Sequence, residues 1–174
     1  MCGERMTTAE SQWLSESCLG RGLPQQAEQH LRLAGLSYHE DTVAEAHLRA
    51  AQAAAPEHIA VQIGFYRYYF YKGRLTDALA VAERCLRWAA TMLGLNNNWR
   101  RVTATDAMFD SFDAILPRFF LFTLKGYAYL QMRVGQQDEG MRAAVQLTCL
   151  DPSDKLGGKR LLQVFERQGR DDDE

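Results

Sequence analysis

The chain has 174 residues, enough for one domain with its own core, and its 47% hydrophobic and 24% charged residues are ordinary for a soluble globular protein. The formal net charge of −2 gives no overall attraction to nucleic acid or anionic lipid, and no segment has the roughly 18 apolar residues of a membrane span. Four widely spaced cysteines exclude a disulfide framework and a paired metal motif, so we expect a cytoplasmic protein with reduced thiols.

The apolar pattern predicts helices throughout, and the alternation typical of half-buried strands is hard to find. The stretch Thr7–Glu10 fits a capping box that opens a helix ending near Leu19, and Pro24 suits the first turn of the next helix. Gly73 is expected to end a later helix in a left-handed conformation. The helices expected between Pro24 and the first long loop cover about 24–36, 41–54, 57–72 and 75–93.

Residues 94–103 are rich in asparagine and predict a loop, and a helix is expected over 104–116. Its apolar face would consist of Met108, Phe109, Phe112, Ile115 and Leu116. The opposite face would carry Asp106, Asp110 and Asp113, which read as solvated carboxylates rather than metal ligands. Pro117 then opens a helix to about Val134, further helices follow at 137–149 and 154–168, and the acidic tail 169–174 is expected to be disordered.

Small and apolar residues recur at an offset of 34 residues. Ala44, Leu48 and Ala51 align with Ala78, Ala82 and Cys85, and a third copy contains Leu124, Tyr127, Ala128, Ala144, Leu147 and Pro152. This helix–turn–helix pattern resembles the tetratricopeptide repeat over roughly 24–152, although the tryptophan typical of each repeat is absent. The resemblance implies an all-α solenoid of about three hairpins in one domain, 1–168, with units at 24–56, 57–93 and 117–152. The segment 94–116 would be an inserted loop and helix, and the final helix would cap the array. The alternative is a non-repeating helical bundle.

No residue pattern predicts catalysis, a metal or a cofactor. The four histidines, His30, His39, His47 and His58, form no i, i+4 pair and read as solvated residues on helix surfaces. The stretch "LGGKR" at 156–160 lacks the first glycine and the Ser/Thr of a phosphate-binding loop, and Cys85 and Cys149 fall on small-residue faces typical of a core. We therefore expect a protein that is not an enzyme; a cysteine- or histidine-dependent enzyme is the less favoured alternative.

Residues 65–71, "FYRYYFY", are six aromatics and one arginine. In a repeat closed by Gly73, Phe65, Tyr66 and Tyr69 would pack between helices, and Arg67, Phe70 and Tyr71 would face the concave surface that binds partners. Tyr68 lies between these two sets. The expected partner-binding residues are Arg67, Phe70, Tyr71, Phe122, Lys125, Tyr129, Met132 and Arg133. Two alternatives are that the helix over 104–116 buries them, or that they stack on nucleic acid, for which a wider basic surface is lacking.

Three segments, "IGFYRYYFYKGRLTDAL", "LPRFFLFTLKGYAYLQMRVG" and "LDPSDKLGGKRLLQVFER", resemble small tetratricopeptide-like proteins of nitrogen-fixation gene clusters, of the nitrogenase-associated factor type. This resemblance implies a non-catalytic adaptor or chaperone-like accessory factor. Such a factor would bind the nitrogenase molybdenum–iron protein during maturation or damage of that enzyme. A generic tetratricopeptide scaffold for another cytosolic partner is the alternative.

Overall fold

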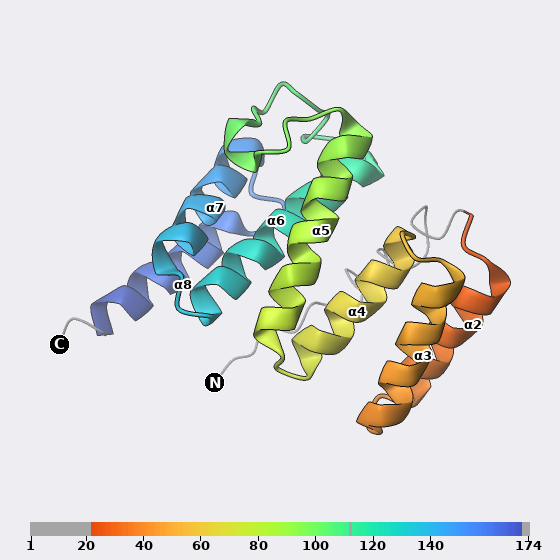
Figure 1. Cartoon of the computed structure of the whole chain (residues 1–174). Helices are drawn as coiled ribbons and strands as arrows, with labels where there is room; N and C mark the ends of the chain where they lie inside the picture. Colours follow the sequence, from red (N-terminus) through yellow and green to blue (C-terminus); the bar gives the residue numbers. More distant parts are fainter. Residues whose placement is uncertain (1–21, 112, 172–174) are drawn as a thin grey trace. The chain divides into compact units, whose positions relative to one another are not determined.

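The computed structural model describes residues 22–111 and 113–171, and within them all regular structure is helical (Figure 1). The expectation of an all-α chain is therefore confirmed for this part of the sequence. The helix expected to end near Leu19 lies outside the described residues, as does the end of the tail, 172–174. The chain divides into two compact units, Met1–Tyr68 and Tyr69–Glu174, called here the first and the second unit. None of the described helices combines the length and apolar character needed to cross a membrane.

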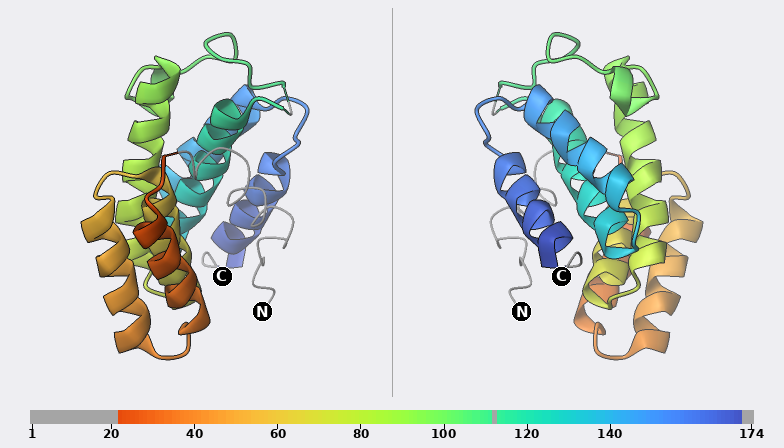
Figure 2. Two further views of the ribbon diagram at one scale, coloured as in Figure 1. Left: turned by 90° about the vertical axis from the view of Figure 1, so that its right-hand side faces the viewer. Right: turned by 90° about the vertical axis from the view of Figure 1, so that its left-hand side faces the viewer.

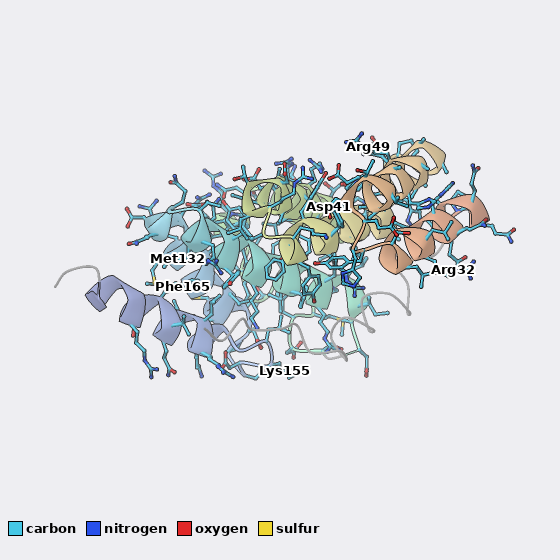
Figure 3. The ribbon with its side chains drawn as sticks, turned by 90° about the horizontal axis from the view of Figure 1, so that it is seen from below. Arg32, Asp41, Arg49, Met132, Lys155 and Phe165 are labelled. Carbon is cyan, nitrogen blue, oxygen red and sulfur yellow. The ribbon has the colours of Figure 1, made fainter. Side chains whose placement is uncertain are left out.

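The first unit contains an antiparallel hairpin of two helices, α2 (Gln25–Leu36) and α3 (Asp41–Ala54) (Figure 1). Alanines and one leucine make the contact between the helices, because small side chains allow close approach: Ala27, Ala34, Ala44, Leu48 and Ala51 are buried. The outer faces are polar, and Arg32 and Arg49 extend from the hairpin into solvent (Figure 3).

The helix α4 (Ile59–Tyr71) follows the hairpin, and its last three residues belong to the second unit. Gly64 lies where α4 approaches the hairpin most closely. A Cβ atom at this position would lie 2.8 Å from Leu31 Cδ2 and 3.4 Å from Leu48 Cδ2. A side chain at this position would therefore displace the end of the Leu31 side chain, whereas the backbone conformation of Gly64 does not require a glycine.

The second unit contains α5 (Leu75–Leu93), a short 3₁₀ turn η1 (Trp99–Arg101), α6 (Ile115–Arg133), α7 (Gln137–Leu150) and α8 (Gly158–Asp171). Each α-helix packs on the next along the chain, and the connection from α5 to α6 crosses one end of the unit (Figure 2). The largest fully buried side chains of this unit are Phe120, Leu124, Leu130, Leu147, Leu150 and Val81. α8 extends to Asp171, beyond the expected end of the domain at 168.

Three helix ends share one hydrogen-bond pattern; at the end of α5, Gly94 has φ 67° and the Leu95 amide donates to the Ala90 carbonyl at 2.8 Å. Gly73 has φ 71° and Gly135 has φ 86°, the left-handed conformation that glycine adopts without strain. After α4, the Arg74 amide donates to the Tyr69 carbonyl at 2.9 Å, and after α6 the Gln136 amide donates to the Gln131 carbonyl at 2.8 Å. These six-to-one bonds are typical of the Schellman motif, so the sequence correctly located the helix ends at Gly73 and Gly135.

The helix expected over 104–116 is wrong. The described residues from 103 to 114 form turns, and α6 begins only at Ile115. The Asp106 carboxylate accepts hydrogen bonds from the Thr103 amide and the Thr103 hydroxyl, both at 2.8 Å, and such local bonds compete with helix formation. Of the expected apolar face, Phe109 is buried with its ring centroid 5.9 Å from that of Phe120, whereas Met108 is 65% exposed. The alternative that a helix over 104–116 buries the aromatic residues is therefore not supported, because that helix does not form among the described residues.

Candidate functional site

Four predicted binding residues come together in the second unit, where α4 and α6 end. The Phe70 ring lies 5.7 Å from the Tyr71 ring in an edge-to-face arrangement and 5.8 Å from the Tyr129 ring, measured between centroids. Arg133, one helical turn after Tyr129, donates a hydrogen bond of 2.6 Å from Nη1 to the Tyr129 hydroxyl, and its Cζ lies 5.6 Å from the centre of that ring. We call Phe70, Tyr71, Tyr129 and Arg133 the aromatic–arginine cluster.

The cluster is accessible to solvent. Tyr71 is 43% exposed, Arg133 is exposed, and Phe70 and Tyr129 are half-buried. Within the described part of the chain, Arg133 forms no ion pair with a carboxylate. An arginine held beside aromatic rings without a carboxylate partner can accept a carboxylate of another molecule, and arginine and tyrosine are enriched in interface hot spots.

The other four predicted binding residues are Arg67, Phe122, Lys125 and Met132. Arg67 belongs to the first unit and is half-buried. Phe122, Lys125 and Met132 are half-buried on α6. Met132 packs against α7, since a Cβ at Gly140 would lie 2.5 Å from Met132 Cγ.

Within residues 65–71, helical spacing assigned Tyr68 to neither the packing set nor the binding set, and the structure shows it to be a packing residue. Tyr68 is buried with Phe65 in the first unit, at 6% and 7% exposure, and its ring meets that of Tyr38 edge-on at 6.3 Å. Tyr66 and Tyr69 are only half-buried. The reason is that the side chains of three helices, and not the periodicity of α4 alone, decide which face is covered.

The loop expected over 94–103 is tied to the helices of the second unit. Gln146 on α7 donates hydrogen bonds from Nε2 to the backbone carbonyls of Trp99 and Val102, at 3.2 and 2.7 Å. The centroids of the Trp99 and Tyr127 rings are 6.0 Å apart. The Arg100 guanidinium lies over the Trp99 ring, with Cζ 4.3 Å from the ring centroid. These contacts satisfy buried backbone groups and stabilise the loop, which is a structural role rather than a chemical one.

Sequence reasoning missed a pair of histidines in the first unit. Nδ1 of His30 on α2 lies 3.1 Å from Nδ1 of His47 on α3, and both residues are half-buried. A signal was present in the sequence: His30 lies seven residues before Ser37 and His47 seven residues after Glu40, so a hairpin closing over 37–40 places them opposite each other. Among residues 22–111 and 113–171, no three His, Cys, Asp or Glu side chains come together as a potential metal site.

The chain is 36% identical over 129 residues to a protein of Azotobacter chroococcum mcd 1 with the name "Uncharacterized 19.8 kDa protein in nifW 5'region". The alignment covers 74% of this chain and 72% of that relative. No family model and no solved structure matches the chain. The relative supports the expected association with a nitrogen-fixation gene cluster. The chain belongs to the same family as this protein from the nifW 5′ region.

Proposed function

We propose that the protein is a non-catalytic, cytoplasmic accessory factor of nitrogen fixation that binds a protein partner through the aromatic–arginine cluster. The observation that carries this proposal is its kinship with a protein from the nifW 5′ region. The partner we propose is the nitrogenase molybdenum–iron protein, bound during maturation or damage of that enzyme.

A tetratricopeptide-like architecture is part of the proposal. It is supported by the packing of neighbouring helices within each unit, α2 on α3 and α5 to α8 in order, and by small residues buried at the 34-residue offset, such as Ala44 and Ala78. Gly73 and Gly135 support it as well, because they end helices and lie 62 residues apart, close to two repeat lengths; the hydrogen-bond pattern itself also follows Gly94. Proteins built from such stacked helical units present extended surfaces for binding.

The chemistry of the cluster suggests what it recognises. The second unit, residues 69–174, contains 15 lysines and arginines against 14 aspartates and glutamates, so its net charge is close to zero and the charge of the cluster comes from Arg133. Arg133 supplies a directed positive charge, and Tyr71 supplies an exposed ring. The surface therefore suits an acidic segment of a partner that carries a carboxylate next to an apolar side chain.

Affinity capture tests the proposal. The tagged chain is expressed in a nitrogen-fixing host under nitrogen-fixing conditions, and the recovered molybdenum–iron protein is quantified. We expect Arg133→Ala and Tyr71→Ala each to weaken binding about 30-fold, equivalent to roughly 2 kcal/mol at a central anchor. Arg142→Ala is the matched control, because Arg142 is an exposed arginine on α7 of the same unit and should leave recovery unchanged.

Two results would contradict different parts of the proposal. If both cluster variants recover as much molybdenum–iron protein as the wild type does, the partner binds to another surface of the chain. Failure of the wild-type chain to recover the molybdenum–iron protein, under conditions in which that protein accumulates, would reject it as the partner.

A further inference from the structure

We propose that His30 and His47 form a two-histidine binding site for a divalent transition-metal ion on the α2–α3 hairpin. The two Nδ1 atoms lie 3.1 Å apart, and the ring centroids are 5.3 Å apart with the ring planes inclined by 34°. In the metal-free chain one Nδ1 donates a hydrogen bond to the other. This site lies in the first unit and does not depend on the proposed partner.

The distance between the nitrogens suits a shared metal ion. Zinc–imidazole bonds are about 2.0–2.1 Å long, so two ligands at the tetrahedral angle lie about 3.3 Å apart, and two at a right angle about 2.9 Å apart. The observed 3.1 Å falls between these values. A metal ion could therefore bridge the two rings after small rotations of the side chains, without movement of the helices.

The hairpin pre-organises both ligands. α2 and α3 pack against each other along a line of alanines, and the Glu40 amide donates to the Ser37 carbonyl at 2.8 Å to close the turn between them. The backbones of His30 and His47 are thus already placed before the metal binds. Binding requires that both Nδ1 atoms offer a lone pair, so the ring that donates from Nδ1 must carry its hydrogen on Nε2 instead.

The ligand set indicates the class of metal. Imidazole suits Zn²⁺, Ni²⁺ and Cu²⁺, whereas Mg²⁺ and Ca²⁺ prefer oxygen ligands. Because no third His, Cys, Asp or Glu joins the pair within the described residues, the remaining coordination positions would be filled by water or by a ligand from outside these residues. The site is therefore open, in contrast to a closed four-ligand structural zinc site.

Titration of the full chain with Zn²⁺ or Ni²⁺ at pH 7.5 tests the site, using protein treated with a chelator and then freed of it. We expect one equivalent of metal to bind, with affinity at least tenfold lower in His30→Gln and in His47→Gln. His39→Gln and His58→Gln are matched controls, and Cys149→Ser tests the exposed thiol; all three should bind like the wild type. Metal should also raise the unfolding temperature of the wild type more than that of either pair variant.

Binding that is unchanged in both pair variants, or that is lost in Cys149→Ser, would overturn the proposal. Circular dichroism without metal shows whether the pair variants keep their helices. If they do not, the imidazole NMR signals of the wild-type chain decide: Zn²⁺ must shift those of His30 and His47, and shifts confined to His39 and His58 would reject the site.

Discussion

The Tyr127 hydroxyl on α6 donates a hydrogen bond of 2.7 Å to Oε1 of Glu139 on α7. The same carboxylate accepts hydrogen bonds on both of its oxygens from the Arg100 guanidinium, which comes from the η1 turn. One carboxylate therefore joins two helices and the loop between α5 and α6. Because Arg100 also covers the Trp99 ring, the packing of this loop depends on the charge of Glu139.

The stability of the second unit should fall at alkaline pH because of Tyr127. Burial, and then the hydrogen bond to Glu139, raise the pKa of Tyr127 to about 12. The pKa is raised above its unfolded value near 10, so the contribution to stability is complete below pH 10 and is lost as pH rises through about 12. Tyr127→Phe should reduce this alkaline loss and lower the free energy of unfolding near pH 7 by about 0.5–1.5 kcal/mol.

Urea unfolding between pH 7 and 11, with the tyrosine absorbance titrated in parallel, measures both effects. Tyr71→Phe is the control, because Tyr71 is exposed and its replacement should leave the pH dependence of the free energy of unfolding unchanged. An alkaline loss of the same size in Tyr127→Phe as in the wild type would show that another group is responsible.

Asp106 should titrate below its usual range. The Thr103 amide, and secondarily the Thr103 hydroxyl, donate to the Asp106 carboxylate and lower its pKa from 3.8. Since the folded pKa is depressed, this interaction is complete above the unfolded pKa and is lost as pH falls through the folded one. NMR titration should show the Thr103 amide and the Asp106 carboxyl changing with one midpoint below 3.8.

Thr103→Val is the control for this turn, because it removes only one of the two hydrogen bonds that lower the Asp106 pKa. It removes the hydroxyl donor but keeps the backbone amide, so the Asp106 pKa should rise part of the way towards 3.8. An Asp106 midpoint at or above 3.8 in the wild type would mean that the two hydrogen bonds are not formed in solution.

Features set by neighbouring residues in the chain, such as helix ends, could be predicted from the sequence. Features set by how one helix aligns with another could not. The bounds of α5 were predicted as 75–93 because Gly73 and Gly94 flank an uninterrupted apolar face. The apolar spacing over 104–116 predicted a helix wrongly, since hydrogen bonds between Thr103 and Asp106 compete with it. The histidine pair required the register of two helices, which only the turn at 37–40 encodes.

The candidate binding cluster was predicted in part for the same reason. Tyr129 and Arg133 are four residues apart on one helix, so helical periodicity alone places them together. Phe70 joins them from the end of α4, a contact that needed the repeat comparison between Gly73 and Gly135. Periodicity could not show that Met132, next to Arg133, is turned towards α7.

The two described cysteines should differ strongly in reactivity. Burial raises the pKa of the Cys85 thiol to about 12, whereas Cys149 is exposed. Because the thiolate is the reactive form, Cys85 should react at pH 8 only when α5 opens. Brief treatment with N-ethylmaleimide followed by peptide mass spectrometry should find Cys149 modified and Cys85 intact, and both modified in denaturant. Equal modification in the folded chain would contradict the buried position of Cys85.

The contact between α6 and α7 should tolerate no side chain at Gly140. A Cβ there would lie 2.5 Å from Met132 Cγ, 2.8 Å from the Ala128 carbonyl oxygen and 3.0 Å from the Met132 amide nitrogen. The last two atoms are backbone, so the helices would have to separate. Gly140→Ala should therefore lower the free energy of unfolding by about 1–2 kcal/mol, because overpacking outweighs the roughly 1 kcal/mol gained in helix propensity.

Gly35→Ala on α2 separates these two effects, because no atom lies within 4 Å of its Cβ position and its φ is not positive. With only the gain in helix propensity, this substitution should raise stability by about 0.5–1 kcal/mol. The two variants are thus expected to shift urea unfolding in opposite directions. The double variant Met132→Ala/Gly140→Ala shows which atoms oppose a Cβ at position 140. It removes the flexible Met132 side chain but keeps the Ala128 carbonyl, so its free energy of unfolding should be only partly restored from that of Gly140→Ala. Full recovery would mean that the helix backbones are farther apart than the Gly140 contacts require.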